Sequence, residues 1–162
     1  MHTINMVELV QVSGLFETHL TVSDLQRSIA FYRDIIGLEL GIEVPEHNCA
    51  FFWVGGSKRS MLGLWSTGLI PNGLKLHLAF KLKDINQLFD IPRRLRSKGI
   101  TPLNLFGQET DEPTVIAWMP AASVFFRDPD DHLIEYLAML DDEEPRPHLG
   151  LIPWSDWVVQ KK

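Results

Sequence analysis

Two stretches of the chain alternate apolar and polar residues in the same way, and each carries a histidine at the same point of the alternation. They run over residues 16–22 and 74–80, with the histidines at His19 and His77. Such alternation is typical of a half-buried β-strand. Each stretch leads into a segment that opens with an aspartate and has helical spacing. The pattern therefore predicts a repeated strand–helix unit that divides the chain nearly in half.

The first half should continue as one helix followed by three strands. The helix is expected to begin near Asp24 and to end at Gly37, because apolar residues recur on one helical face between them. That face consists of Leu25, Ile29, Tyr32 and Ile36. Strand-like stretches follow at residues 38–44, 50–54 and 60–67, and turn-forming residues separate them.

The second half repeats this order with weaker local signals. A helix should open at Asp84 and end at Gly99. Pro92 should break it into two turns, so that the helix survives with a kink, because proline lacks a backbone N–H group. Strands are expected near residues 100–106, 114–119, 124–126 and 133–138, with a turn at 128–131. The pattern leaves open whether Pro120 interrupts one strand or separates two.

The chain changes character after residue 140. Residues 141–144 are all acidic, three prolines follow, and Trp154 and Trp157 lie near the end. We expect a single domain over residues 1–140, made of modules at about 14–67 and 74–140. Residues 141–162 form a C-terminal tail that docks on the body or on a partner.

Charge and cysteine content exclude several classes of function. The net charge of −6 over 162 residues disfavours attraction to phosphate backbones, so we expect no nucleic acid partner. The one basic run, residues 93–96, fits the solvated face of a helix. Cys49 is the single cysteine, and neither a leader nor a membrane-length apolar run is visible. We therefore expect a cytoplasmic protein without membrane contact.

Two longer motifs carry a resemblance to a known family. The first is His-Leu-Thr-Val-Ser-Asp-Leu at residues 19–25, with supporting matches at 28–32 and 37–40. The second is Phe-Arg-Asp-Pro-Asp-Asp-His at residues 126–132, which leads to Glu135. Over roughly residues 15–140 the chain resembles the vicinal oxygen chelate superfamily, which includes glyoxalase I, extradiol dioxygenases, fosfomycin-resistance enzymes and bleomycin-resistance proteins. The resemblance implies an α+β fold in which two tandem βαβββ modules form a curved mixed sheet enclosing a cup-shaped site. It also implies a homodimer.

The resemblance also assigns metal ligands. His19 matches the histidine ligand of the family's first module, His77 that of the second, and Glu135 the carboxylate of the last strand. Gly63 stands where glyoxalase I has a fourth, glutamate ligand, and a glycine side chain can neither bind a metal nor act as a base. This departure puts in doubt the usual glyoxalase isomerisation, which relies on a carboxylate at that place. It leaves coordination positions open to water or substrate, and the general base is not identified.

The residues themselves are compatible with such a site. Strand periodicity places His19 and Thr21 on one face of their strand, and Glu135 on one face of the last strand. Nitrogen and oxygen donors without a thiolate suit a divalent metal ion such as Zn, Ni, Mn, Fe or Co and do not select among them. One strand histidine alone is more often structural. The joint pattern of two repeat-related histidines and a glutamate predicts a catalytic metal site.

The lining of the cup decides the substrate. The candidates are Thr21, Gly63, Trp65, Trp118, Ser123 and Phe125, with Trp53 as a further aromatic residue. Aromatic residues in strands are more often part of the core. The other histidines, at positions 2, 47, 132 and 148, are expected to be structural or solvated. Asp131 stands where the family's turn has glycine, and aspartate tolerates the left-handed conformation that such a turn needs.

These observations predict a glyoxalase-like metalloenzyme that binds a small oxygenated substrate on a divalent metal, as a lyase, an isomerase or a thiol transferase. The alternative is a metal-free ligand-binding or drug-sequestering protein of the bleomycin-resistance type. A fosfomycin-modifying enzyme fits less well, because residues 141–144 are acidic where a phosphonate would need cations. An extradiol dioxygenase also fits less well, because those enzymes are longer than this chain.

Overall fold

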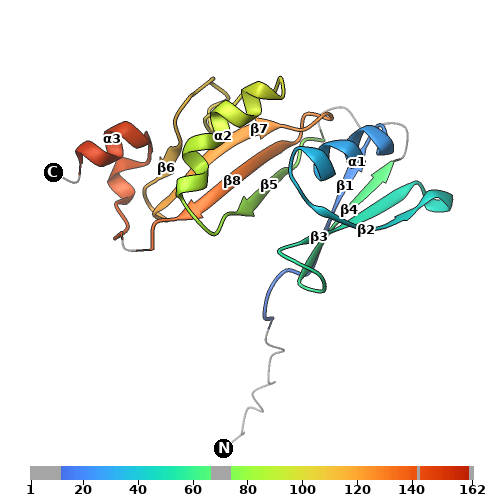
Figure 1. Ribbon diagram of the computed structural model, residues 1–162. Coiled ribbons are helices and arrows are strands. Elements are labelled where there is room, and N and C mark those ends of the chain that lie inside the picture. The colour runs from blue at the N-terminus through green and yellow to red at the C-terminus, as the bar shows by residue number, and fades with distance from the viewer. Residues whose placement is uncertain (1–11, 67–73, 142, 161–162) are drawn as a thin grey trace, which may run out of the picture.

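The computed structural model describes residues 12–66, 74–141 and 143–160 and contains two successive βαβββ modules (Figure 1). The first module consists of β1 (Glu17–Val22), α1 (Leu25–Asp34), β2 (Glu39–Val44), β3 (Cys49–Val54) and β4 (Ser60–Ser66). The second consists of β5 (His77–Lys81), α2 (Asn86–Ser97), β6 (Thr114–Ile116), β7 (Ala121–Arg127) and β8 (Leu133–Met139). Short 3-10 helices, η1 (Pro45–His47) and η2 (Pro147–Leu149), lie in connections. The predicted α+β fold with tandem modules is confirmed.

Each module forms its own mixed sheet. The strand order is β1-β4-β3-β2 in the first sheet and β5-β8-β7-β6-β9 in the second, where β9 (Leu151–Pro153) belongs to the tail. The first strand of each module pairs in parallel with the last, and the neighbouring pairs are antiparallel. The strands therefore form two open sheets of four and five strands, and not one continuous sheet.

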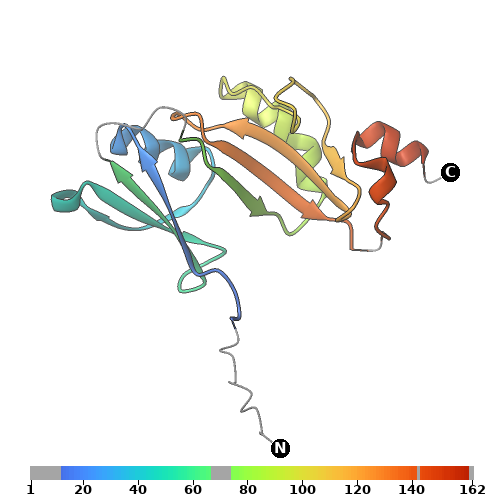
Figure 2. The same cartoon turned by 180° about the vertical axis from the view of Figure 1, so that it is seen from behind.

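Each helix covers one face of its own sheet and leaves the other face open. In α1 the apolar residues Ile29, Phe31 and Tyr32 are buried, and Asp24 caps the helix by accepting a hydrogen bond from the Arg27 N–H group at 3.0 Å. Both helices lie on the same side of the molecule in the two opposite views (Figures 1 and 2). The functional side chains of the strands are consequently found on the uncovered faces.

In the second module the predicted helix is present, and one predicted strand is missing. Helix α2 is a single helix that continues through Pro92. Proline removes only one backbone hydrogen bond, and the buried residues Leu88, Ile91 and Leu95 hold the helix on the sheet. Residues 100–106 form no strand, and only isolated bridges occur at Leu103.

A local turn at Asn104 explains why residues 100–106 form no strand. The Asn104 side chain accepts hydrogen bonds from the N–H groups of Phe106 and Gln108, both at 3.0 Å. Such side-chain bonds compete with strand pairing.

Residues 117–120 form a turn, and β6 and β7 on either side of it pair antiparallel. Pro120 therefore lies between two strands.

The tail docks on the body of its own chain. Strand β9 pairs antiparallel with β6, and α3 (Trp154–Val159) follows it. The Trp157 side chain is fully buried in the core, with the Arg146 guanidinium 4.9 Å from its ring centre. Trp154 packs edge-on against Phe89 of α2. The tail thus extends the second sheet and closes one end of its core.

A polar cluster joins the two modules. Asp130, in the turn between β7 and β8, accepts hydrogen bonds from the Ser23 hydroxyl at 2.5 Å and the Arg27 guanidinium at 2.7 Å. Asp128, in the same turn, accepts one from the Tyr32 hydroxyl at 2.9 Å. Asp131 has φ of 68°, as predicted for a residue in the place of glycine. The turn of the second module is therefore fixed against β1 and α1 of the first.

His132 adds to this junction and is buried and structural, as expected. The Leu76 N–H group donates to Nδ1 at 3.1 Å, so the ring proton must lie on Nε2. Nε2 donates in turn to the Thr21 carbonyl oxygen at 3.0 Å. The neutral ring thus links β1 of the first module to the start of β5.

The structure contains no membrane-spanning helix: within the described ranges, none of the helices has both the length and the apolar character that a bilayer requires.

Candidate functional site

Glu135 is the centre of the candidate site in the second module. Its side chain is nearly fully buried on the open face of β8, where an unpaired carboxylate would be costly. Two partners offset that cost: the Ser123 hydroxyl donates to Oε1 at 2.5 Å, and Oε2 lies 2.9 Å from Nε2 of His77. Phe125 is fully buried beside them, with its ring centre 6.1 Å from that of His77. Two predicted metal ligands and two predicted pocket residues thus lie together.

His19 is the centre of a second, aromatic cluster in the first module. Its ring lies 5.9 Å from that of Phe51 and 5.8 Å from that of Trp65, measured between ring centres. Gly63 is its register partner on β4. A Cβ atom at position 63 would lie 2.7 Å from Cδ2 of His19 and 3.1 Å from Nε2. The absence of a side chain at position 63 therefore makes room for the histidine ring.

The register of the two parallel strand pairs relates the modules to each other. In the second module, Glu135 lies opposite Ala79, two residues after His77. The same relation in the first module leads from His19 to Thr21 and across to Trp65. Trp65, and not Gly63, therefore corresponds to Glu135 in the repeat. Strand β4, with the sequence SMLGLWS, carries no carboxylate at either position.

Glu17 is a site residue that the sequence reasoning missed. Its Oε1 atom lies 3.3 Å from Nε2 of His19, and both side chains are partly exposed. Alternation along β1 puts the two residues on the same face. That spacing, two residues before a predicted ligand, was the available signal. Each module therefore presents one histidine–carboxylate pair, His19 with Glu17 and His77 with Glu135.

The two pairs do not converge within the chain. Across residues 12–66, 74–141 and 143–160, no three or more histidine, cysteine, aspartate or glutamate side chains lie close enough together to hold a metal ion. Each pair nevertheless suits one: ligand atoms about 2.0–2.2 Å from a metal, at tetrahedral to octahedral angles, are about 2.9–3.5 Å apart. The observed separations of 2.9 and 3.3 Å match that range. Each pair supplies two ligand atoms, and the described residues of one chain bring no third histidine, cysteine or carboxylate beside either pair.

The remaining predicted pocket residues and the remaining histidines lie in different parts of the structure. Thr21 offers its backbone carbonyl to His132. Trp53 is partly buried on β3 and packs near Gly41. Trp118 lies in the turn 117–120 and is 59% exposed, so its predicted place in a strand was wrong. His47 and His148 lie in the exposed short helices η1 and η2, and His2 lies outside the described residues.

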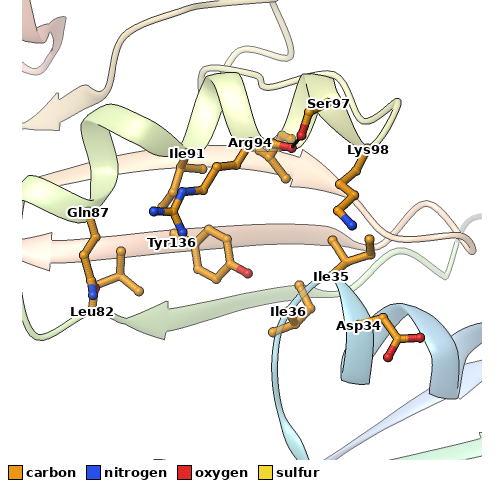
Figure 3. Close-up of a pocket in the computed structure, with 11 residues that line it drawn as sticks. Asp34, Ile35, Ile36, Leu82, Gln87, Ile91, Arg94, Ser97, Lys98 and Tyr136 are labelled. Carbon is orange, nitrogen blue, oxygen red and sulfur yellow. Dashed lines mark hydrogen bonds between the residues drawn. The ribbon is translucent and has the colours of Figure 1, made fainter.

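Cavities occur on both sides of the junction between the modules. One of about 310 Å³ lies between β1 and β5 and is lined by Glu17 and His77 among others. Another, of about 430 Å³, lies between α1 and α2, where Arg94 extends from α2, Lys98 from the residue that caps its C-terminus and Tyr136 from β8 (Figure 3). Tyr136 alternates with Glu135 along β8, so this second cavity opens on the opposite side from the candidate site. Burial raises the pKa of Tyr136 to about 12.

Known proteins resemble this chain in sequence and in architecture. The model of the Glyoxalase/Bleomycin resistance protein/Dioxygenase superfamily matches residues 9–136. The YraH protein of Bacillus subtilis (strain 168) is 29% identical over 136 residues, which cover 78% of this chain and 98% of YraH. An integron cassette protein from the mobile metagenome of the Halifax Harbour sewage outfall is 28% identical with a TM-score of 0.65, covering 79% of this chain and all of that one. A superfamily protein from Nocardioides is 25% identical with a TM-score of 0.61, covering 85% and 91%. The chain belongs to the Glyoxalase/Bleomycin resistance protein/Dioxygenase superfamily.

Proposed function

We propose that the chain is a glyoxalase-like metalloenzyme in which His19, His77 and Glu135 hold a divalent metal ion. The observation that carries the proposal is the buried Glu135 carboxylate, with one oxygen fixed by Ser123 and the other beside Nε2 of His77. A buried carboxylate oriented by a hydroxyl group and adjacent to a histidine is typical of an ordered metal-ligand set. The nitrogen and oxygen donors suit Zn, Ni, Mn, Fe or Co.

The chain's own residues would serve binding and orientation. Ser123 holds Glu135 in one rotamer, Phe125 keeps water from the carboxylate, and the rings of Phe51 and Trp65 wall the first half of the site. A bound divalent ion supplies a Lewis acid that polarises oxygen atoms of a small substrate. Lyase, isomerase or thiol-transferase chemistry on an oxygenated compound fits this arrangement.

The two halves of the site meet in a homodimer under this proposal. The polar cluster around Asp130 fixes the modules of one chain in an arrangement where the histidine–carboxylate pairs stay apart. A second copy brings its own open sheet faces. Pairing the first module of one chain with the second module of the other unites His19 with His77 and Glu135 and leaves coordination positions for substrate.

Metal content per chain tests the proposal. Plasma mass spectrometry on untagged protein, reloaded with each candidate metal, should find near-stoichiometric metal in the wild type and almost none in a His77→Ala, Glu135→Ala double variant. A His47→Ala, Glu46→Ala variant in the exposed η1 helix changes the same residue types and should keep its metal. A wild-type protein that binds none of these metals would contradict the proposal. If the wild type binds metal and the double variant does not, the metal-loaded protein would be screened with thiol adducts of 2-oxoaldehydes, epoxides and catechols.

The second candidate function is metal-free binding of an aromatic or drug-like molecule. The three-ring cluster of His19, Phe51 and Trp65 favours it, because aromatic walls bind flat apolar ligands. Ligand-induced quenching of tryptophan fluorescence across a compound library would discriminate the two. Binding that is lost in Trp65→Ala but unchanged in His77→Ala supports the metal-free function, and the reverse pattern supports the enzyme.

A further inference from the structure

We propose that the cavity between α1 and α2 binds a small organic anion, namely a carboxylate with an apolar body. The cavity measures about 430 Å³ and lies between the two helices (Figure 3). Protein cavities of about 300–1,000 Å³ are the usual size for small-molecule ligands. This site is independent of the proposed metal site, because Tyr136 in its lining alternates with Glu135 along β8 and lies on the opposite face.

Apolar side chains from both modules form the walls of the cavity. Ile35 and Ile36 follow α1 in the first module, whereas Leu82, Ile91 and Leu95 belong to the second. An apolar ligand body that covers these side chains is bound favourably, because apolar surface is removed from water. The cavity therefore suits the apolar part of a ligand, which would contact both modules at once.

Two cations and one carboxylate border the cavity, and the carboxylate already has a partner. The Arg33 guanidinium donates to both oxygens of Asp34, at 2.7 and 2.8 Å. These bonds, and to a smaller extent the charge of Lys98, lower the pKa of Asp34. Arg94 reaches Asp90 only at 3.7 Å, and Lys98 forms no salt bridge with any residue that the structure describes. The border thus retains positive charge for an incoming anion.

The Tyr136 hydroxyl is the third polar group at the cavity. Burial raises the pKa of Tyr136 to about 12, so at neutral pH the group is an uncharged O–H donor. It has no hydrogen-bond partner among the described residues. Figure 3 shows the hydroxyl pointing into the space between the helices, toward which Arg94 and Lys98 extend. An unpaired donor beside two cations favours a charged acceptor, and a planar guanidinium matches a carboxylate in particular.

The experiment is a calorimetric titration of the full-length protein with octanoate, octanol and octylamine. These compounds share one apolar chain and at neutral pH carry a negative, no and a positive charge, respectively. We expect octanoate to bind one site per chain. Octanol and octylamine should bind about 10-fold more weakly or less, because they lose the charge-assisted hydrogen bonds.

Variants separate the polar contacts from apolar burial. An Arg94→Gln, Lys98→Gln double variant should weaken octanoate binding by about 10-fold or more. Tyr136→Phe keeps the ring and removes only the hydroxyl, so it should weaken binding by about 2- to 10-fold. The matched control is Lys58→Gln, Arg59→Gln, which makes the same charge change in the exposed turn between β3 and β4 and should match the wild type.

The location of the bound anion is tested separately. The His77→Ala, Glu135→Ala variant should bind octanoate like the wild type, because neither residue lines this cavity. Loss of octanoate in that variant would place the ligand on the open sheet faces and overturn the proposed site, whatever the metal content. Circular dichroism of each variant verifies that the fold is retained.

Three further results would overturn the anion site. The first is absence of octanoate binding to the wild type at millimolar concentration. The second is equal affinity for octanoate and octanol, or wild-type affinity in Arg94→Gln, Lys98→Gln, since apolar burial alone would then explain binding. The third is an equal loss in the Lys58→Gln, Arg59→Gln control, which would attribute binding to net charge. Unchanged affinity in Tyr136→Phe would overturn the contact of the hydroxyl with the anion.

Discussion

At the scale of single residues, the two tyrosines are the clearest reporters of how the core is built. The sequence contains only Tyr32 and Tyr136. Burial is the main reason why the pKa of each phenol is raised above its usual value of 10.0, and for Tyr32 the neighbouring Asp128 carboxylate raises the pKa further. Tyr136 reaches a pKa of about 12.

An alkaline titration of tyrosinate absorbance should therefore follow unfolding. A phenol with a raised folded-state pKa stabilises the fold fully below the unfolded value of 10.0, and this contribution is lost as the pH rises through the folded value, about 12 for Tyr136. We expect little tyrosinate in native protein at pH 10, where unfolded chains are half ionised. In Tyr136→Phe, the remaining signal of Tyr32 should appear only with loss of secondary structure. Ionisation of both tyrosines near pH 10 in folded protein would contradict the burial described above.

For the candidate site residues, the sequence predicted the strand faces better than it predicted the hydrogen-bond partners. Alternation is a local property, so it placed His19, His77 and Glu135 on strand faces correctly. The bond from Ser123 to Glu135 depends on the pairing of β7 with β8, which alternation does not determine. Glu17 was overlooked because a glutamate at the start of a strand has the pattern of an ordinary exposed residue.

At the scale of secondary-structure elements, the turn between β7 and β8 is the main connection between the modules. Asp130 in that turn is nearly buried and contacts Ser23, Arg27 and Ser28 of the first module. Charge-assisted hydrogen bonds of this kind are stronger than neutral ones. Their loss should affect how the modules hold together more than how each one folds.

Asp130→Ala should lower the free energy of unfolding by about 1–3 kcal/mol, because buried donors lose their acceptor. Urea denaturation followed by circular dichroism measures this value. Asp90→Ala is the matched control: Asp90 pairs with Arg93 and Arg94 on the solvated face of α2 and should leave stability close to that of the wild type. Equal stability of the two variants would show that the cluster does not join the modules.

Element types were predictable where periodicity extends over many residues, and less so elsewhere. Strands β3 and β8 lie within one residue of their expected bounds, and helix α1 begins within one residue of its expected start but ends at Asp34, before the expected stop at Gly37. Residues 100–106 have strand-like composition, but the side-chain bonds of Asn104 form a turn instead. Helix α2 continues through Pro92 because packing on the sheet outweighs a local preference.

At the scale of the whole molecule, the arrangement of the two sheets decides where a complete site can form. Alternation determines which face of a strand is buried but not which sheet edges meet, so the sequence could not show that the strands form two open sheets. The separation of the histidine–carboxylate pairs follows from that arrangement.

Mixing complementary variants tests whether a site is shared between two chains. His19→Ala and Glu135→Ala chains, carrying different tags, are co-expressed and the mixed dimers are purified. If the site joins the first module of one chain to the second module of the other, each mixed dimer contains one intact site. We expect one metal ion per mixed dimer and almost none in either variant alone. Mixed dimers without metal would place the site within a single chain, and a monomeric wild type by light scattering would exclude sharing.

Gly63 limits how this site could change by mutation. Any other residue at position 63 displaces the His19 ring, because its Cβ atom would lie 2.7 Å from the imidazole. A glutamate at position 63 and His19 in its present place are therefore alternatives, and a single substitution cannot add the carboxylate without moving the histidine. Selection for an activity that needs His19 in this place would keep glycine at position 63, and a mutational route to a glutamate at that position would require a second, compensating change in the same step.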